Sequence, residues 1–144
     1  MTQDRSHIGI SDAEIVALAS AHRLFGFFRW ELDTGHFYAS ADVFRIFGLT
    51  PSSSPMNLVD ATASVHPDDL PVLMRAYEHS SATRADFHYI YRVADGNGGY
   101  RYIRTAGQFR DNGQAEIAGI TYEMFENLQT IGVVGTMTIV PETT

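Results

Sequence analysis

The feature that most constrains the fold of this chain is a change of hydrophobic period along its length. Phe28, Trp30 and Leu32 are separated by charged residues, and this period of two predicts a strand with one buried face. Residues 33–35, Asp-Thr-Gly, have turn chemistry and predict a hairpin that returns over 36–39.

Helical spacing replaces the alternation in the middle of the chain. It predicts short helices over 41–47 and 57–65 and a longer one from Leu70 to about residue 80. Ser40 is expected to cap the first of these helices and Gly48 to end it.

Alternation returns in the last third of the chain and predicts three more strands, over 86–94, 100–111 and 115–127. Turns rich in Asp, Asn and Gly separate them. Two strands, three helices and three strands in this order indicate an α+β fold, in which helices cover one face of an antiparallel sheet.

Both ends of the chain lie outside this pattern. Ser11 and Glu14 form a capping box, and Ile15 and Leu18 follow at helical spacing, so the N-terminal part is expected to be a short amphipathic helix. The segment 128–144 is expected to be a tail or an extra strand, because much of it is β-branched.

Charge and composition exclude several classes of function. The formal net charge of −7 and a pI near 5.2 oppose binding to nucleic acid or to an anionic membrane. The chain has no cysteine, which excludes disulfides, thiol nucleophiles and cysteinyl chromophore adducts. The N-terminus has no signal-peptide pattern, so a cytoplasmic protein is expected.

Several short motifs together resemble those of a PAS domain, of the subtype with an HPDD helix start. The resemblance covers residues 26–127, so residues 1–25 are expected to form a helical flank. The motifs are GFFRWELDTG (26–35), IFGL (46–49), HPDD (66–69), YRVADG (91–96), RYI (101–103) and DNG (111–113).

The resemblance implies a five-stranded antiparallel sheet with short helices on one face and a pocket between them. It also implies a sensory, non-enzymatic module that binds a small ligand or a partner protein and regulates a histidine kinase or another effector. PAS domains of the light-oxygen-voltage and coumaric-acid types need a cysteine, which is absent here. Haem-binding members usually carry a histidine near the position of Leu73 and Met74, so haem is not expected and the cofactor stays open.

The interior pocket is expected to be lined by large apolar and aromatic side chains. The alternative is that these side chains simply fill the core at the density of a crystal. The candidates are Phe28, Trp30, Phe44, Phe47, Met56, Val59, Met74, Tyr89, Tyr91 and Ile103.

The stretch HPDDL, residues 66–70, admits two interpretations. The first places Asp68 and Asp69 in the first turn of a helix, where free amides favour carboxylates. The alternative is a small α+β enzyme in which His66 and Asp69 act as an acid–base pair. Metal binding is not expected, because one helical turn does not present a closed set of ligands.

The last strand departs from the usual PAS ending. Family members commonly end in an Asp-Ile-Thr-x-Arg signature, whereas this chain keeps an acid at Glu123 but has Phe125 and Asn127 at the later positions. No effector sequence follows, so the chain is either cut from a longer signalling protein or, as Met1 and the polar ending favour, a stand-alone PAS protein.

The N-terminal helix is expected to form an interface. Its apolar residues Ile15 and Leu18, together with Phe25, need a surface to cover, which predicts a homodimer or a contact with a signalling partner.

Overall fold

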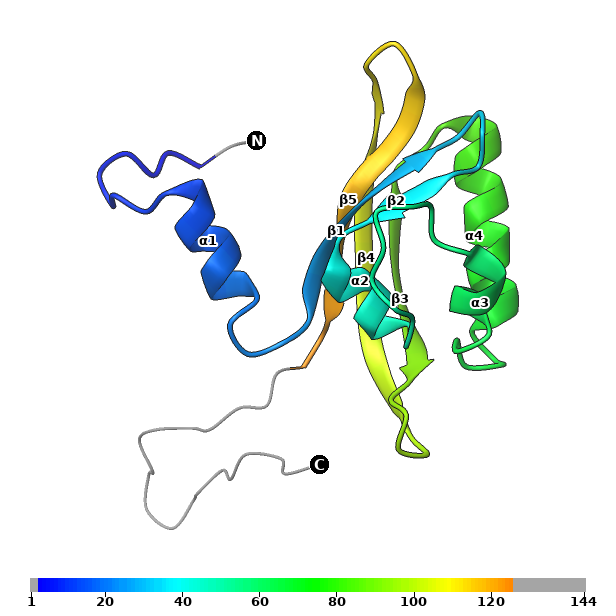
Figure 1. Cartoon of the computed structure of the whole chain (residues 1–144). Coiled ribbons are helices and arrows are strands. Elements are labelled where there is room, and N and C mark those ends of the chain that lie inside the picture. The colour runs from blue at the N-terminus through cyan, green and yellow to red at the C-terminus, as the bar shows by residue number, and fades with distance from the viewer. Residues whose placement is uncertain (1–2, 126–144) are drawn as a thin grey trace. The chain divides into compact units, whose positions relative to one another are not determined.

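A computed structural model of the chain describes residues 3–125 (Figure 1). The described residues fall into two units. One is the N-terminal segment up to Arg23, and the other is a domain from Leu24 to Phe125. The predicted tail at 128–144 and the predicted strand end at 126–127 lie outside the described residues.

The N-terminal segment contains one helix, α1 (Asp12–Ala19), and its predicted capping box is confirmed. The Glu14 amide donates to the Ser11 hydroxyl, and the Ser11 amide donates to the Glu14 carboxylate, both at 3.1 Å. No residue of α1 is buried, and Leu18 is 66% exposed. Phe25, which the sequence placed in this flank, belongs instead to the first strand of the domain.

The domain is built on one five-stranded antiparallel sheet with the spatial order β2-β1-β5-β4-β3. This confirms the predicted α+β fold and the predicted order of two strands, three helices and three strands. The strands are β1 (Phe25–Glu31), β2 (Phe37–Ala39), β3 (Phe87–Ala94), β4 (Tyr100–Asp111) and β5 (Ala115–Glu123).

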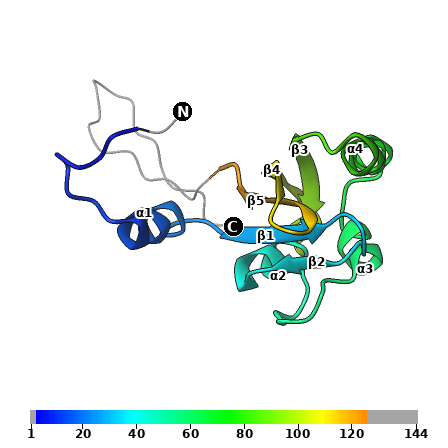
Figure 2. The same cartoon turned by 90° about the horizontal axis from the view of Figure 1, so that it is seen from above.

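Three helices connect β2 to β3 and cover one face of the sheet (Figures 1 and 2). They are α2 (Ala41–Ile46), α3 (Leu58–Thr62) and α4 (Leu70–Thr83). Helix α3 is shorter than the predicted 57–65, and α4 runs three residues past its predicted end. Gly48 ends the α2 region as predicted, with a φ of 71° that favours glycine.

Ser40 does not cap α2 in the predicted way. It occupies the position before the helix, but its hydroxyl accepts a hydrogen bond from the Phe27 amide at 2.9 Å instead of from a helix amide. The hydroxyl therefore joins the strand β1 to the start of α2.

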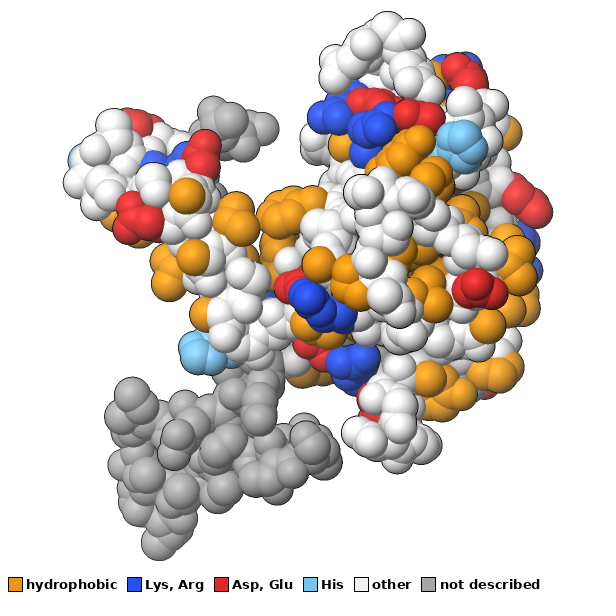
Figure 3. Space-filling view, in the orientation of Figure 1, with side chains coloured by type: hydrophobic (Ala, Val, Ile, Leu, Met, Phe, Trp, Pro, Cys, Tyr) orange, Lys and Arg blue, Asp and Glu red, His pale blue; other side chains and the backbone are white. Residues whose placement is uncertain are grey.

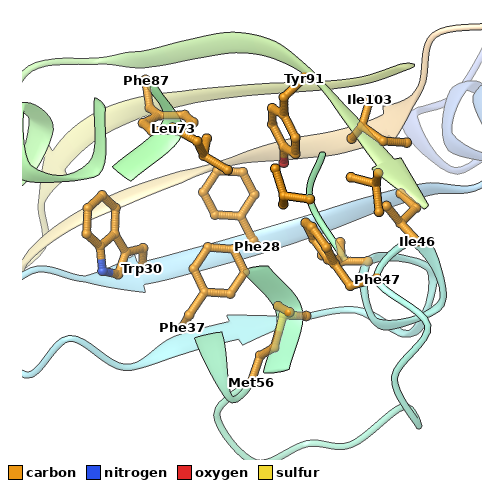
Figure 4. Packing of buried hydrophobic residues seen from close by; sticks show 14 of the residues in the cluster. Phe28, Trp30, Phe37, Ile46, Phe47, Met56, Leu73, Phe87, Tyr91 and Ile103 are labelled. Atoms are coloured by element: carbon orange, nitrogen blue, oxygen red, sulfur yellow. The ribbon is translucent and has the colours of Figure 1, made fainter. Parts of the chain in front are cut away.

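The core lies between the covered face of the sheet and the helices. Its side chains alternate along each strand, so that Phe28 and Trp30 of β1, Ile103 of β4 and Ile117 of β5 all face the helices. Figure 4 shows the rings of Phe28 and Phe37 beside one another, and these rings stack with centroids 5.0 Å apart. Each such side chain stabilises the fold by about 1.5–3 kcal/mol when it is fully buried.

Acidic and basic side chains gather on the domain below the β4–β5 turn (Figure 3). Arg29 pairs with Glu31 and lies 3.4 Å from Glu116, which in turn pairs with Arg110. These pairs connect β1, β4 and β5 on the face of the sheet opposite the helices. The Arg29 guanidinium and the Thr34 hydroxyl hold the pKa of Glu31 below its ordinary value.

Gly26 allows α2 to pack closely against β1. A Cβ atom at this position would lie 2.5 Å from Val43 Cγ2 and 2.9 Å from the Val43 backbone nitrogen. A contact with backbone cannot be relieved by a change of side-chain rotamer, so the helix would have to move.

We predict that Gly26→Ala lowers the free energy of unfolding by about 1–3 kcal/mol, the usual cost of overpacking. Urea unfolding of both proteins measures the change. Gly99→Ala is the matched control, because its Cβ would approach only the Asp95 side chain, at 3.0 Å. Equal losses in the two variants would show that α2 does not depend on this close approach.

Candidate functional site

The interior of the domain contains a small cavity between the sheet and the helices. Its volume is about 10 Å³ for the centre of a water-sized sphere, which is room for about one water molecule. The wall is largely aromatic and is completed by residues of α3 and α4. It consists of Phe28, Trp30, Phe37, Phe47, Met56, Leu58, Ala61, Thr62, Tyr77, Phe87, Tyr91, Thr105 and Thr121.

A chain of three hydroxyl groups lies on the sheet side of this cavity. Thr105 and Thr121 are paired across β4 and β5, and their hydroxyl oxygens are 3.0 Å apart. The Tyr91 hydroxyl, from β3, lies 2.7 Å from that of Thr105. All three residues are buried, so the hydrogen bonds replace those that water would make. Burial raises the pKa of Tyr91 to about 12, although its bond to Thr105 opposes the shift.

Tyr77 brings a fourth hydroxyl to the wall from α4. Its ring stacks on Phe87 with centroids 5.0 Å apart and meets Trp30 edge-on at 5.4 Å. Tyr77 is half-buried, and its hydroxyl makes no hydrogen bond within residues 3–125. Desolvation, assisted by the nearby Tyr91, raises the pKa of Tyr77 above its ordinary value.

The structure brings together half of the side chains that the sequence predicted for the pocket. Phe28, Trp30, Phe47, Met56 and Tyr91 all lie on the wall of the cavity. In Figure 4 these side chains and their neighbours converge from β1, β3 and the segments beside α2 and α3.

The other five predicted residues lie elsewhere. Phe44 and Ile103 are buried in the core but are not on the wall, and Tyr89 is half-buried in a surface hollow beside Asp69. The prediction that Val59 and Met74 face the interior is wrong, since their exposed fractions are 78% and 41%.

The two errors have a common cause in helix geometry. On α4 the buried positions are Leu73, Ala76 and Ser80, and Met74 follows Leu73 by about 100° around the axis. On α3 a single turn of five residues has no repeat from which the buried face could be read. Ala61 turns out to be its buried position.

The polar residues of the wall were not predicted from the sequence. The inward position of Thr105 and Thr121 could have been predicted from the sequence. Each lies an even number of residues from a buried isoleucine on its own strand, so it points to the same face of the sheet as that isoleucine. The position of Thr62 could not have been predicted, because nothing in the sequence fixes the orientation of α3.

The HPDDL stretch holds α4 against β3. The Asp69 carboxylate accepts hydrogen bonds from the Arg92 amide at 2.8 Å and from the Arg92 side chain at 2.8 and 2.9 Å. The expected placement of Asp68 and Asp69 in the first turn is wrong, because α4 begins at Leu70.

The contacts of His66 and Asp69 bear on the alternative of an enzyme that uses them as an acid–base pair. His66 Nδ1 accepts a hydrogen bond from the Asp68 amide at 3.0 Å, while both oxygens of Asp69 are engaged by Arg92. Neither His66 nor Asp69 lies on the wall of the cavity. In the part of the chain that the structure describes, no three histidine or acidic side chains are grouped to hold a metal ion.

Glu123 forms a second clamp at the end of β5. Its carboxylate accepts hydrogen bonds from the Leu24 amide at 2.7 Å and from Arg101 at 2.8 Å, and its amide donates to the Leu24 carbonyl at 3.1 Å. The acid that the PAS ending retains therefore ties together the first and last strands of the domain, at the points where the chain enters and leaves it.

Comparison with known proteins identifies the family. The family profile described as PAS fold matches residues 36–121, which is more than half of the chain. The chain therefore belongs to the PAS family. Comparison with curated proteins found no match.

Solved structures show the same fold at low sequence identity. An RNA-binding light-oxygen-voltage receptor superposes with a TM-score of 0.60 at 15% identity and 75% coverage of this chain, which spans 31% of that receptor. A sensory box histidine kinase/response regulator from Burkholderia thailandensis gives 0.55 at 24% identity, covering 76% of this chain and 82% of that one. The N-terminal domain of a diguanylate cyclase from Marinobacter aquaeolei gives 0.53 at 21% identity, covering 71% and 94%.

None of the helices in residues 3–125 combines the length and the apolar character needed to cross a bilayer.

We predict that Asp69→Asn lowers the free energy of unfolding by about 1–2 kcal/mol at pH 7, because it weakens charge-assisted hydrogen bonds to Arg92. Arg92 holds the pKa of Asp69 below its ordinary value of 3.8. A depressed folded-state pKa stabilises the fold above the unfolded pKa, and this stabilisation is lost as the pH falls through the folded value. The difference between the two proteins should therefore shrink below pH 4.

Chemical unfolding at a series of pH values tests this prediction. Asp68→Asn is the control, since Asp68 lies beside Asp69 but its carboxylate makes no hydrogen bond within residues 3–125. An equal loss of unfolding free energy in both variants would contradict a stabilising role for the Asp69–Arg92 hydrogen bonds. A loss in Asp69→Asn that persists unchanged at pH 3 would contradict it as well.

Proposed function

We propose that this chain is a sensory PAS module that binds a small ligand in its interior and passes the change to a signalling protein. The observation that carries the proposal is the enclosed cavity with hydroxyl groups on an otherwise apolar wall. A few convergent polar groups in an apolar pocket are typical of small-molecule sites.

A route from the cavity to the ends of the domain supports the proposal. Thr121 and Glu123 are two residues apart on β5, and Thr105 and Arg101 are four apart on β4. Both pairs of positions share one face of a hydrogen-bonded strand pair. A ligand that shifts the threonines therefore acts on the strands that carry the Glu123–Arg101 clamp.

The effector and the assembly are parts of the same proposal. The solved PAS structures from a histidine kinase/response regulator and a diguanylate cyclase support a two-component kinase or a cyclase as the partner. A homodimer through α1 is proposed because Ile15 and Leu18 expose apolar surface. Light scattering on the full chain and on a chain lacking residues 1–23 tests the dimer, and a monomeric mass for the full chain would exclude it.

Two properties of the chain separate it from the light-oxygen-voltage receptor. It has no cysteine to form a photochemical adduct, and its net charge of −7 opposes RNA binding. These two properties argue against a photochemical adduct and against RNA binding in this chain.

A ligand-free interaction adaptor is the second candidate, and the cavity volume favours it. Room for about one water means that side chains nearly fill the interior in this conformation. A ligand larger than water has to displace part of the wall.

We predict that the full chain, purified without denaturation, carries a small molecule that native mass spectrometry detects and that denaturation releases. Ala61→Val places extra volume on the buried face of α3 and should abolish retention, whereas Val72→Ile at an exposed position of α4 should not. Circular dichroism checks that both variants fold. The bare sequence mass in wild type and both variants would support the adaptor and contradict ligand sensing.

A further inference from the structure

The cavity wall has more hydroxyl protons than acceptors. Tyr91, Thr105 and Thr121 have three O–H groups but make only two hydrogen bonds with one another, so one proton of the chain has no acceptor. Tyr77, which is half-buried, adds a second hydroxyl proton that makes no hydrogen bond. Both counts refer to bonds within residues 3–125. An unsatisfied donor in a buried site is costly, and the wall is therefore suited to a ligand that brings an acceptor.

The wall carries no charge. None of its thirteen residues is Asp, Glu, Lys, Arg or His, and the nearby charged groups are paired in clamps away from the cavity. An ionised ligand would be buried without a counter-charge, at a cost that exceeds the value of a hydrogen bond. The ligand is therefore neutral.

The rest of the wall fixes the shape of the ligand. Five rings, those of Phe28, Trp30, Phe37, Phe47 and Phe87, surround the space, and such surfaces pack best against a flat apolar group. Met56 is the side chain best able to yield, because it is unbranched and flexible. Its backbone stays anchored by a hydrogen bond from the Met56 amide to the Phe37 carbonyl, at 2.7 Å.

We propose that the cavity selects an uncharged, planar, mostly apolar molecule with a carbonyl-type oxygen, which accepts the free proton of the hydroxyl chain and that of Tyr77. This inference rests on the proposed sensory function and specifies its ligand. One carbonyl oxygen has two lone pairs, and the wall offers two unused protons.

Three probes of nearly equal size test the ligand class. Acetophenone has a neutral carbonyl, α-methylstyrene replaces the oxygen by a methylene group, and benzoate carries a charge. Titration of the full chain, followed by NMR through the Met56 methyl signal, gives the affinity of each. Met56→Ala, followed through threonine methyl signals, enlarges the cavity and serves as a second host if the wild-type interior is too full.

Variants of the wall separate the contribution of the hydrogen bond to ligand affinity from that of hydrophobic contact. Tyr77→Phe removes one donor, and the triple variant Tyr91→Phe, Thr105→Val, Thr121→Val removes the hydroxyl chain. Each should lower the affinity for acetophenone about two- to tenfold relative to that for α-methylstyrene, as expected for one neutral hydrogen bond. Thr83→Val is the control and should leave the ratio unchanged, because Thr83 is not on the wall and its hydroxyl donates to the His79 carbonyl at 2.7 Å.

The outcomes separate this inference from the proposed function. Binding of benzoate at least as tight as that of acetophenone, or a ratio that no variant changes, overturns the ligand class. If native mass spectrometry still finds a retained molecule, the sensory function stands without this ligand class. No shift with any probe in wild type or Met56→Ala means that the cavity holds water only, and this result overturns the inference.

Discussion

The burial of one face of an antiparallel sheet under three short helices is the constraint on which the structure depends. Side chains alternate along a strand, so the burial of Ile103 and Ile117 also brings Thr105 and Thr121 inside. Their hydroxyls cannot reach water there and bond to each other and to Tyr91. The polar groups of the cavity are thus a consequence of the same pattern that forms the core.

The sequence predicted what depends on local pattern. The order of elements, the capping box at Ser11 and the alternating inner positions of β1 follow from periodicity and turn chemistry, and all three are confirmed. The predictions for Val59 and Met74 were wrong because the buried face of a short helix is set by tertiary packing. The Asp69–Arg92 clamp joins residues 23 apart in sequence, and only the three-dimensional fold brings them together.

The interior and the ends of the domain share two strands. β4 carries Arg101 and Thr105, and β5 carries Thr121 and Glu123, so the hydroxyl chain and the clamp belong to one hydrogen-bonded unit. The proposed sensory function uses this connection, since a ligand in the cavity would alter the packing of β4 and β5, and β5 ends at Glu123. Phe125 and Asn127 stand where the usual PAS ending has threonine and arginine, which leaves Glu123 as the retained contact.

The enclosure of the hydroxyl groups is the central claim, and a spectrophotometric titration of the tyrosines tests it most directly. The chain has seven tyrosines, and a phenol in water ionises near pH 10. The account predicts a late class that ionises near pH 12 or above while the protein stays folded, and that loses one member in each of Tyr77→Phe and Tyr91→Phe. Ionisation of all seven tyrosines near pH 10 in the folded protein would contradict the enclosure of these hydroxyl groups.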